Sequence, residues 1–211
     1  MPTLDFWYEF ASTYSYPAAM RIEAAANAAG VDIRWRPFLL GPIFKAYGWT
    51  DSPFNIFAAK GRYMWRDLTR ICHDTDIPLR LPPVRFPQNG LKAARLALVG
   101  EAEGWTPAFS RAVFAANYAE QKDISEDATL RPILDALGVD VEAALAAANT
   151  PENKDALRRQ TRLRRAAYSA RRPSPSGTSC SGATTGWKRH SIGLRPIDLT
   201  TGPHVYDSDC C

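Results

Sequence analysis

The first 40 residues carry two runs in which apolar and polar positions alternate. From Leu4 to Phe10 every second side chain is large and apolar, which predicts a strand with Glu9 on its other face. Residues 31–39 alternate in the same way and predict a second strand. An alanine-rich helix, 18–29, lies between them and ends at Gly30. This order of elements predicts an α/β fold with a right-handed crossover.

Helical spacing dominates from residue 43 to about residue 161. Ser125 and Thr150 are expected N-caps, because a hydroxyl can accept a bond from the first turn, and Pro151 suits a first helical position. The best-defined helices expected here are 91–103, 107–121, 126–137 and 141–148. A helical block therefore interrupts an α/β domain whose sheet has only begun, and two strands alone do not make a stable sheet.

The composition is that of a soluble globular chain, with 45% apolar and 23% charged residues among 211. No apolar run is long enough to span a membrane. Residues 1–5 lack the basic and apolar regions of a signal peptide. We therefore expect a cytoplasmic location and no membrane partner.

The net charge of +4 is unevenly distributed along the chain. From Arg162 onward, eight Lys and Arg residues stand against three Asp, which gives +5 and leaves −1 for residues 1–161. Within this late segment the run from Arg171 to Gly186 is rich in Ser, Thr, Gly and Pro, a composition typical of a disordered tail. Because the basic excess belongs to one segment, we expect no nucleic-acid partner.

The four cysteines offer no metal or dithiol site. Cys72 lies in the helical block, whereas Cys180, Cys210 and Cys211 lie in the late segment, and none has zinc-site or CxxC spacing. We expect no bound metal, and we interpret Cys72 as a small buried apolar residue.

Four blocks of sequence, taken in order, point to a known family. They are Asp5–Tyr16 (DFWYEFASTYSY), Gly41–Lys45 (GPIFK), Lys60–Asp67 (KGRYMWRD) and Phe86–Ala93 (FPQNGLKA). Together they resemble the 2-hydroxychromene-2-carboxylate isomerases, which belong to the DsbA-like thioredoxin superfamily and are related to the kappa-class glutathione transferases. The resemblance covers roughly residues 3–161.

The resemblance implies a thioredoxin fold of the α/β class with a large all-helical insertion. The expected division is an N-terminal βαβ half (1–40), the insertion (41–150) and the start of a return helix (151–161). Residues 162–211 are then expected to be an out-of-frame, disordered tail. The C-terminal half of the thioredoxin sheet would be missing or disordered in this chain.

The out-of-frame interpretation depends on the genetic code. The family's Gly-x-Pro loop and its W-G-N-D-R motif are absent from the tail as written. From Tyr168 onward, shifted codons can be built from the last base of one residue's codon and the first two bases of the next. These codons permit the sequence F-G-A-P and, later, W-G-N-D-R. At Trp187 followed by Lys188 the shifted codon can encode only Glu. We infer one lost base, or two gained, close to Thr161 or Arg162. We expect the chain as written to be unstable or inactive.

The first strand–helix junction decides the expected chemistry. The run from Ser12 to Ser15 stands where thioredoxin-like oxidoreductases carry CxxC, so exchange through a cysteine pair is excluded. A serine before a helix is ordinarily an N-cap, but the resemblance places at Ser12 the hydroxyl that activates bound glutathione; Ser15 is the local alternative. The thiol of free glutathione has a pKa of about 8.5. Lowering this pKa by about two units requires the thiolate to be stabilised by roughly 2.7 kcal/mol, which a hydroxyl donor and a helix N-terminus can supply.

The resemblance implies an isomerase with glutathione as its cofactor and Ser12 as both its catalytic and its cofactor-binding residue. The implied reaction interconverts 2-hydroxychromene-2-carboxylate and a trans-o-hydroxybenzylidenepyruvate-type aromatic carboxylate, by thiolate addition and elimination, in aromatic compound catabolism. A kappa-type glutathione transferase or peroxidase and a non-catalytic thioredoxin-like binding protein are the alternatives. A homodimer is implied as well.

Lys60 and Asn89, in two of the matching blocks, are candidate substrate-binding residues. By the resemblance they can face the substrate or the carboxylates of glutathione. The alternatives are a solvated helix residue for Lys60 and a turn residue beside Gly90 for Asn89.

Overall fold

The first three elements form the expected strand–helix–strand unit. The computed structural model describes the backbone of residues 1–170 and the side chains of residues 1–167. Strands β1 (Thr3–Tyr8) and β2 (Asp32–Pro37) pair in parallel, and helix α1 (Ser15–Ala29) connects them. The α/β prediction is confirmed for this half of the fold.

Gly30 and Glu9 show where the elements of this unit end. Gly30 has a φ of 64° and its N–H bonds to the carbonyls of Ala26 and Asn27, so it closes α1 as predicted. Strand β1 ends at Tyr8, before the predicted end of the run. The prediction that Glu9 continues the strand, on the face opposite Tyr8 and Phe10, is wrong, because the strand ends at Tyr8 and the chain turns at Glu9 and buries its side chain.

The remaining described helices form the block predicted after β2 and the return helix. They are α2 (Leu40–Ala46), α3 (Pro53–Ile56), α4 (Ala58–Asp74), α5 (Leu91–Glu103), α6 (Thr106–Tyr118), α7 (Asp127–Ala136), α8 (Val141–Ala148) and α9 (Pro151–Ala170). Helices α5 and α8 have the predicted bounds, and those of α6 and α7 differ by one to three residues. None of the helices described combines the length with the apolar character that a membrane span requires.

Of the two predicted caps, Thr150 is confirmed and Ser125 is not. Thr150 Oγ1 accepts the Asn153 N–H at 3.3 Å in the first turn of α9. Ser125 Oγ instead donates to Asp123 Oδ1 at 2.6 Å, and Glu126 is the residue that precedes α7. Both the N–H and the hydroxyl of Ser125 bond to Asp123 Oδ1, so the side chain takes part in a local turn before α7.

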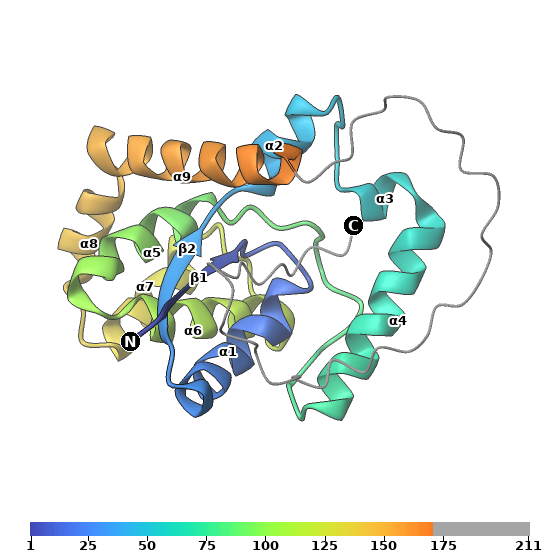
Figure 1. Ribbon diagram of the computed structural model, residues 1–211, viewed down its shortest axis with the longest axis horizontal. Helices are drawn as coiled ribbons and strands as arrows, with labels where there is room; N and C mark the ends of the chain where they lie inside the picture. Colours follow the sequence, from blue (N-terminus) through green and yellow to red (C-terminus); the bar gives the residue numbers. More distant parts are fainter. Residues whose placement is uncertain (171–211) are drawn as a thin grey trace.

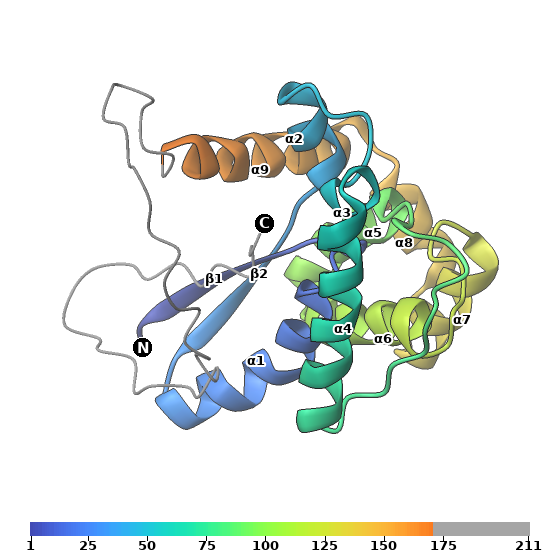
Figure 2. The ribbon, with the colours of Figure 1, turned by 90° about the vertical axis from the view of Figure 1, so that its right-hand side faces the viewer.

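The two strands lie between α1 and α9 (Figure 1 and Figure 2). Helix α5 contacts α6, α8 and α9, and α1 packs on α6, so the helical block is joined to the strand–helix–strand unit. Helices α3 and α4 pack on each other and stand to one side of this body (Figure 1). Within the described residues the sheet has two strands, which agrees with the expected thioredoxin fold that lacks its C-terminal strands.

Aromatic side chains fill the core between the sheet and α6. The rings of Phe6 and Tyr8 stack with centroids 5.5 Å apart, and Trp35 on β2 meets them edge-on at 5.1 Å and 5.2 Å. The Tyr8 hydroxyl is hydrogen-bonded to Ser110 Oγ of α6 at 2.8 Å, so its buried polar atom is satisfied. Burying rings of this size contributes about 2–3 kcal/mol each, which fixes β1 against α6.

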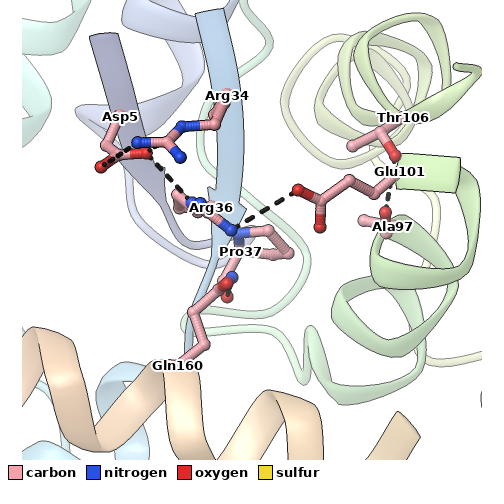
Figure 3. Close-up of polar contacts among 8 residues, drawn as sticks. All are labelled: Asp5, Arg34, Arg36, Pro37, Ala97, Glu101, Thr106 and Gln160. Atoms are coloured by element: carbon pink, nitrogen blue, oxygen red, sulfur yellow. Dashed lines mark hydrogen bonds and ion pairs between the residues drawn. The ribbon is translucent and has the colours of Figure 1, made fainter. Parts of the chain in front are cut away.

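Polar contacts join the other face and the end of the sheet to α5 and α9 (Figure 3). Asp5 on β1 pairs with Arg36 on β2 at 3.1 Å, and Arg36 also reaches Glu101 on α5 at 3.5 Å. Gln160 of α9 donates to the Pro37 carbonyl at 2.6 Å. The ion pairs are partly exposed and contribute at most about 1 kcal/mol each, but together these contacts orient the end of β2.

Helix α9 continues past the point at which the frame shift is inferred. It runs to Ala170, so the prediction of disorder is wrong for residues 162–170. This segment is rich in Arg and Ala, which are strong helix formers, and each added residue contributes one further bond. Arg164 is also buried, with its guanidinium 5.5 Å from the centroid of the Phe38 ring. Residues 171–211, which the same prediction covers, lie outside the described part.

Candidate functional site

A cavity of about 670 Å³ opens where β1 ends and α1 begins. Polar and aromatic side chains line it from the β1–α1 turn, from the α2–α3 region and from the loop before α5. The polar lining includes Glu9, Ser12, Thr13, Gln88 and Asn89, and the aromatic lining is Tyr14, Phe44, Trp49, Phe54 and Phe86. Its volume lies within the range of roughly 300–1,000 Å³ that is typical of small-molecule sites.

Ser12 lies in the turn between β1 and α1. Its N–H donates to the Glu9 carbonyl at 3.0 Å, and its Oγ accepts the N–H of Ser15, the first residue of α1, at 3.4 Å. Ser12 therefore accepts a bond from the first turn as an N-cap does, although Tyr14 is the residue directly before α1, and this bond uses only a lone pair of its oxygen. The hydrogen of the hydroxyl can still be donated to a ligand, at the positive end of the α1 dipole.

Two side chains of α6 hold the backbone next to Ser12. Asn117 Nδ2 donates to the Phe10 carbonyl at 3.0 Å, and the Tyr118 hydroxyl donates to the Ala11 carbonyl at 2.8 Å. Both side chains are buried in the last turn of α6. Because a buried carbonyl without a partner is destabilising, these bonds restrict the turn and the place of Ser12 within it.

Glu9 adds a carboxylate to the same turn. Its side chain is 5% exposed, the only carboxylate so buried among the described residues, and its Oε2 accepts the Ala11 N–H at 3.0 Å. Burial raises the pKa of Tyr118 well above its ordinary value, and the negative charge of Glu9 raises it further. Tyr118 therefore stays protonated at neutral pH and remains a donor to Ala11.

Asn89 lies at the same cavity as Ser12, on the loop that precedes α5. Its side chain is exposed, and its Oδ1 accepts the Leu91 N–H at 3.1 Å. The structure thus brings together two of the residues singled out from the sequence. It also contains the turn bond that the alternative interpretation of Asn89 predicts, so its place at the cavity does not by itself assign a ligand contact.

Lys60, in contrast, is not part of the cavity wall. It is exposed in the first turn of α4, with its Nζ 5.0 Å from the centroid of the Phe57 ring. The α3–α4 pair places Phe54 on the cavity and leaves Lys60 on the outer surface. Lys60 is therefore not brought together with Ser12 and Asn89, and its position is that of the alternative, a solvated helix residue.

Lys45 and Glu9 are charged lining residues that sequence reasoning missed. Lys45 lies in the last turn of α2, next to the lining residue Phe44. Its signal was present, because it is the only charged residue in the matching block Gly41–Lys45. Glu9 belongs to the opening block as well, but strand alternation indicated the wrong direction for its side chain.

Cys72 is buried in α4 and takes no part in the cavity. It is 2% exposed, and burial raises its pKa to about 11, so the thiol is protonated and unreactive at neutral pH. This confirms its interpretation as a small buried residue. The other cysteines lie outside the described residues, within which no group of three or more His, Cys, Asp or Glu side chains is placed to hold a metal ion.

Comparison with known proteins identifies one family and two curated relatives. The model of the DSBA-like thioredoxin domain matches residues 3–168. Glutathione S-transferase kappa 1 of Caenorhabditis elegans is 28% identical over 146 residues, which is 66% of this chain and 64% of that protein, so the chain spans about two thirds of this relative's length. Glutathione S-transferase kappa 1 of Homo sapiens is 26% identical over 168 residues, 75% of this chain and 74% of that protein.

Among solved structures, selenomethionine-labelled 2-hydroxychromene-2-carboxylate isomerase matches with a TM-score of 0.69 and 23% identity, over 78% of this chain and 79% of that chain. At this identity the likeness shows a shared fold. The family match ends at residue 168, close to the position at which the frame shift is inferred. Since that match covers most of the sequence, the chain belongs to the family of the DSBA-like thioredoxin domain.

Proposed function

We propose that this protein, with its reading frame restored, is a glutathione-dependent isomerase that interconverts 2-hydroxychromene-2-carboxylate and trans-o-hydroxybenzylidenepyruvate-type aromatic carboxylates. The observation that carries the proposal is Ser12, a hydroxyl donor at the N-terminus of α1 on the wall of a cavity. It stands where a dithiol oxidoreductase would need cysteine. The likeness to the isomerase structure supports the proposal at the level of the fold.

The lining residues suit glutathione as the cofactor. Ser12 offers a donor to its sulfur, and Lys45 offers a cation to a carboxylate of the tripeptide or of the substrate. Glutathione, when bound, supplies the thiol that adds to the conjugated substrate and later leaves. The names of the two curated relatives, both glutathione S-transferases, support the same cofactor.

The chain's own residues have three tasks in this proposal. The Ser12 hydroxyl stabilises the sulfur as an anion, and a pKa lowered by about two units corresponds to roughly 2.7 kcal/mol. The rings of Phe44, Trp49 and Phe86 offer flat apolar surface to an aromatic substrate and exclude water from it. Lys45 orients the substrate through its carboxylate.

A kappa-type glutathione transferase or peroxidase is the second candidate, and the curated relatives favour it by name. The two functions differ in the fate of glutathione. An isomerase leaves its concentration unchanged over many turnovers, whereas a transferase or peroxidase consumes it. A non-catalytic thioredoxin-like protein would show binding without turnover. A cytoplasmic location and a homodimer stay predictions.

The test is Ser12→Ala, made in the chain as written and in a chain whose reading frame is restored. Glutathione binding is measured by calorimetry, and the pKa of the bound thiol by its ultraviolet thiolate absorbance against pH. We expect Ser12→Ala to return this pKa to about 8.5 and to lower the isomerisation rate at neutral pH by roughly 10- to 100-fold.

Ser125→Ala is the matched control, because Ser125 is a hydroxyl of the described chain that does not line the cavity. It should leave both the thiol pKa and the rate unchanged. An unaltered thiol pKa in Ser12→Ala would remove Ser12 from the mechanism. A restored chain that does not bind glutathione at all would favour a binding protein with another ligand.

A further inference from the structure

Glu9 is a buried carboxylate on the cavity wall that the function proposed above does not use. Taking a carboxylate out of water is strongly unfavourable unless polar partners compensate for it. A buried carboxylate beside a reactive position is therefore expected to serve the site through its hydrogen bonds, through its charge, or through both. Glu9 is three residues before Ser12, so both of its properties act on the proposed thiol site.

Glu9 contacts the turn through three of its polar groups. Its N–H donates to Ser15 Oγ at 3.3 Å, its carbonyl accepts the Ser12 N–H at 3.0 Å, and its Oε2 accepts the Ala11 N–H at 3.0 Å. The last two donors are adjacent peptide groups. The carboxylate therefore lies against the same short stretch of backbone that places the Ser12 hydroxyl.

The loop before α5 packs directly on this carboxylate. A Cβ added at Gly90 would lie 3.0 Å from Phe10 Cβ and 3.1 Å from Glu9 Oε1, which is closer than ordinary contact. Gly90 is buried, and its neighbour Asn89 lines the cavity. The absence of a side chain at Gly90 thus makes room for Glu9 between the loop and the Ser12 turn.

We propose that Glu9 is a positioning residue: its bonds hold the Ser12 turn in place, and its negative charge opposes ionisation of a sulfur held at Ser12. The nucleophilicity of a thiolate falls as the pKa of its thiol falls, and the best attacking thiol has a pKa near the ambient pH. Ser12 and the α1 dipole lower the pKa of the bound thiol. A carboxylate that limits this lowering keeps the thiolate nucleophilic.

Other charged or titratable groups face the same region and also contribute to the electrostatic potential at the sulfur. Lys45 and Asp51 line the cavity from α2 and from the loop before α3. On the side of α6, Tyr118 lies behind the turn, and on the side of α4, Asp67 accepts the Tyr14 hydroxyl at 3.0 Å. Of these groups, Glu9 is the carboxylate bonded to the Ser12 turn itself.

The experiment uses a thiol that belongs to the protein. Ser12→Cys in the full chain places a sulfur at this position, and its pKa is read from alkylation rates against pH, with the modified peptide identified by mass spectrometry. In the Ser12→Cys/Glu9→Gln double variant we expect this pKa to fall by about half a unit to one unit. Below both pKa values the thiolate fraction should then rise about three- to tenfold.

Two further variants separate charge from shape. Ser12→Cys/Glu9→Asp keeps the charge in a shorter side chain and should stay within about 0.3 pKa units of Ser12→Cys. Ser12→Cys/Asp51→Asn removes a cavity carboxylate that is bonded to Ser52 N and Asn55 Nδ2 rather than to the turn, and its shift should be smaller than that of Glu9→Gln. Glu9→Ala replaces Glu9→Gln where the latter does not fold.

An unchanged or raised thiol pKa on neutralising Glu9 overturns the proposal, and so does a Glu9→Asp shift as large as that of Glu9→Gln. The inference rests on the proposed function only for the identity of the natural sulfur. Glutathione binding by the chain with its reading frame restored and Ser12 in place is therefore measured separately. Its absence contradicts the proposed function, whereas the result at position 12 alone decides the role of Glu9.

Discussion

Ser12 and Cys72 are two residues with nucleophilic atoms that lie in opposite environments. Ser12 is half-buried on a cavity wall at the start of α1, where the helix dipole favours negative charge. Cys72 lies on the inward face of α4 with 2% of its surface exposed. We therefore expect the chemistry of the described chain at the Ser12 hydroxyl, which can stabilise the sulfur of a bound ligand, and not at the buried Cys72 thiol.

The burial of Cys72 predicts a loss of stability at alkaline pH. Burial raises the pKa of this thiol from 9.0 to about 11, so the unfolded chain ionises first. Its contribution to stability is complete below the unfolded pKa and is lost as the pH rises toward the folded pKa. The free energy of unfolding of the parent should therefore decrease when the pH is raised from about 8 to about 10. In Cys72→Ala this decrease should be smaller by roughly 1 kcal/mol.

Urea unfolding at both pH values checks this expectation. Tyr8 and Tyr118 also have pKa values raised mainly by burial, and their contribution is common to both proteins. The pKa of Tyr16 is raised by burial and also by the charge of Cys72, so the comparison between the variant and the parent reports the thiol together with its effect on Tyr16. Parallel losses of stability in the two proteins would mean that Cys72 is more accessible than the structure indicates.

At the scale of elements, the α3–α4 pair determines one side of the cavity. Helix α4 buries Gly61, Met64, Leu68 and Cys72, whose spacing places them along one face. Gly61 lies where α3 comes closest, since a Cβ there would be 2.3 Å from the backbone oxygen of Phe54. This close approach allows Phe54 to line the cavity while the opposite face of α4 remains in solvent.

Gly61→Ala should therefore destabilise the protein by about 1–3 kcal/mol, because backbone atoms cannot move aside as a flexible side chain can. Gly41→Ala in α2 is the matched control, since a Cβ at Gly41 meets nothing within 4 Å. The control should be neutral or slightly stabilising, because Ala is the better helix former. Chemical denaturation of both variants measures the difference, and equal midpoints would contradict the close packing of α3 on α4.

At the scale of the whole molecule, the described sheet is small for the helices that pack around it. Strand β1 pairs with β2, and within the described residues no third strand joins them. The aromatic core on the α6 side and the polar contacts to α5 and α9 hold this pair in place. A sheet of this size depends on its helices, since two strands are marginally stable on their own.

Restoring the reading frame is expected to stabilise the molecule. The restored chain should unfold with a larger dependence on denaturant, because it buries more surface, and with a free energy higher by several kcal/mol, on the order of the stability of a small domain. It should also bind glutathione more tightly than the chain as written. Identical denaturation curves for the two chains would contradict the frame-shift interpretation.

Local patterns were sufficient for the elements whose ends depend on nearby residues. The strand–helix–strand order, the closing Gly30, the Thr150 cap and the bounds of α5 and α8 all follow from spacing and capping, which act over a few residues. The place of Ser12 at the start of a helix also followed from the sequence. Its role toward glutathione followed from a resemblance and stays a proposal.

The sequence by itself determined which residues form the first half of a thioredoxin-like sheet and that no cysteine pair stands at its helix. Only the tertiary structure decided that Glu9 turns inward, that Lys45 rather than Lys60 lines the cavity, and that α9 continues to Ala170. The physical reason is that a side chain's direction at the end of an element depends on what packs there. The backbone of the turn after β1, for example, is held by Asn117 and Tyr118, which lie about a hundred residues away and leave no local pattern.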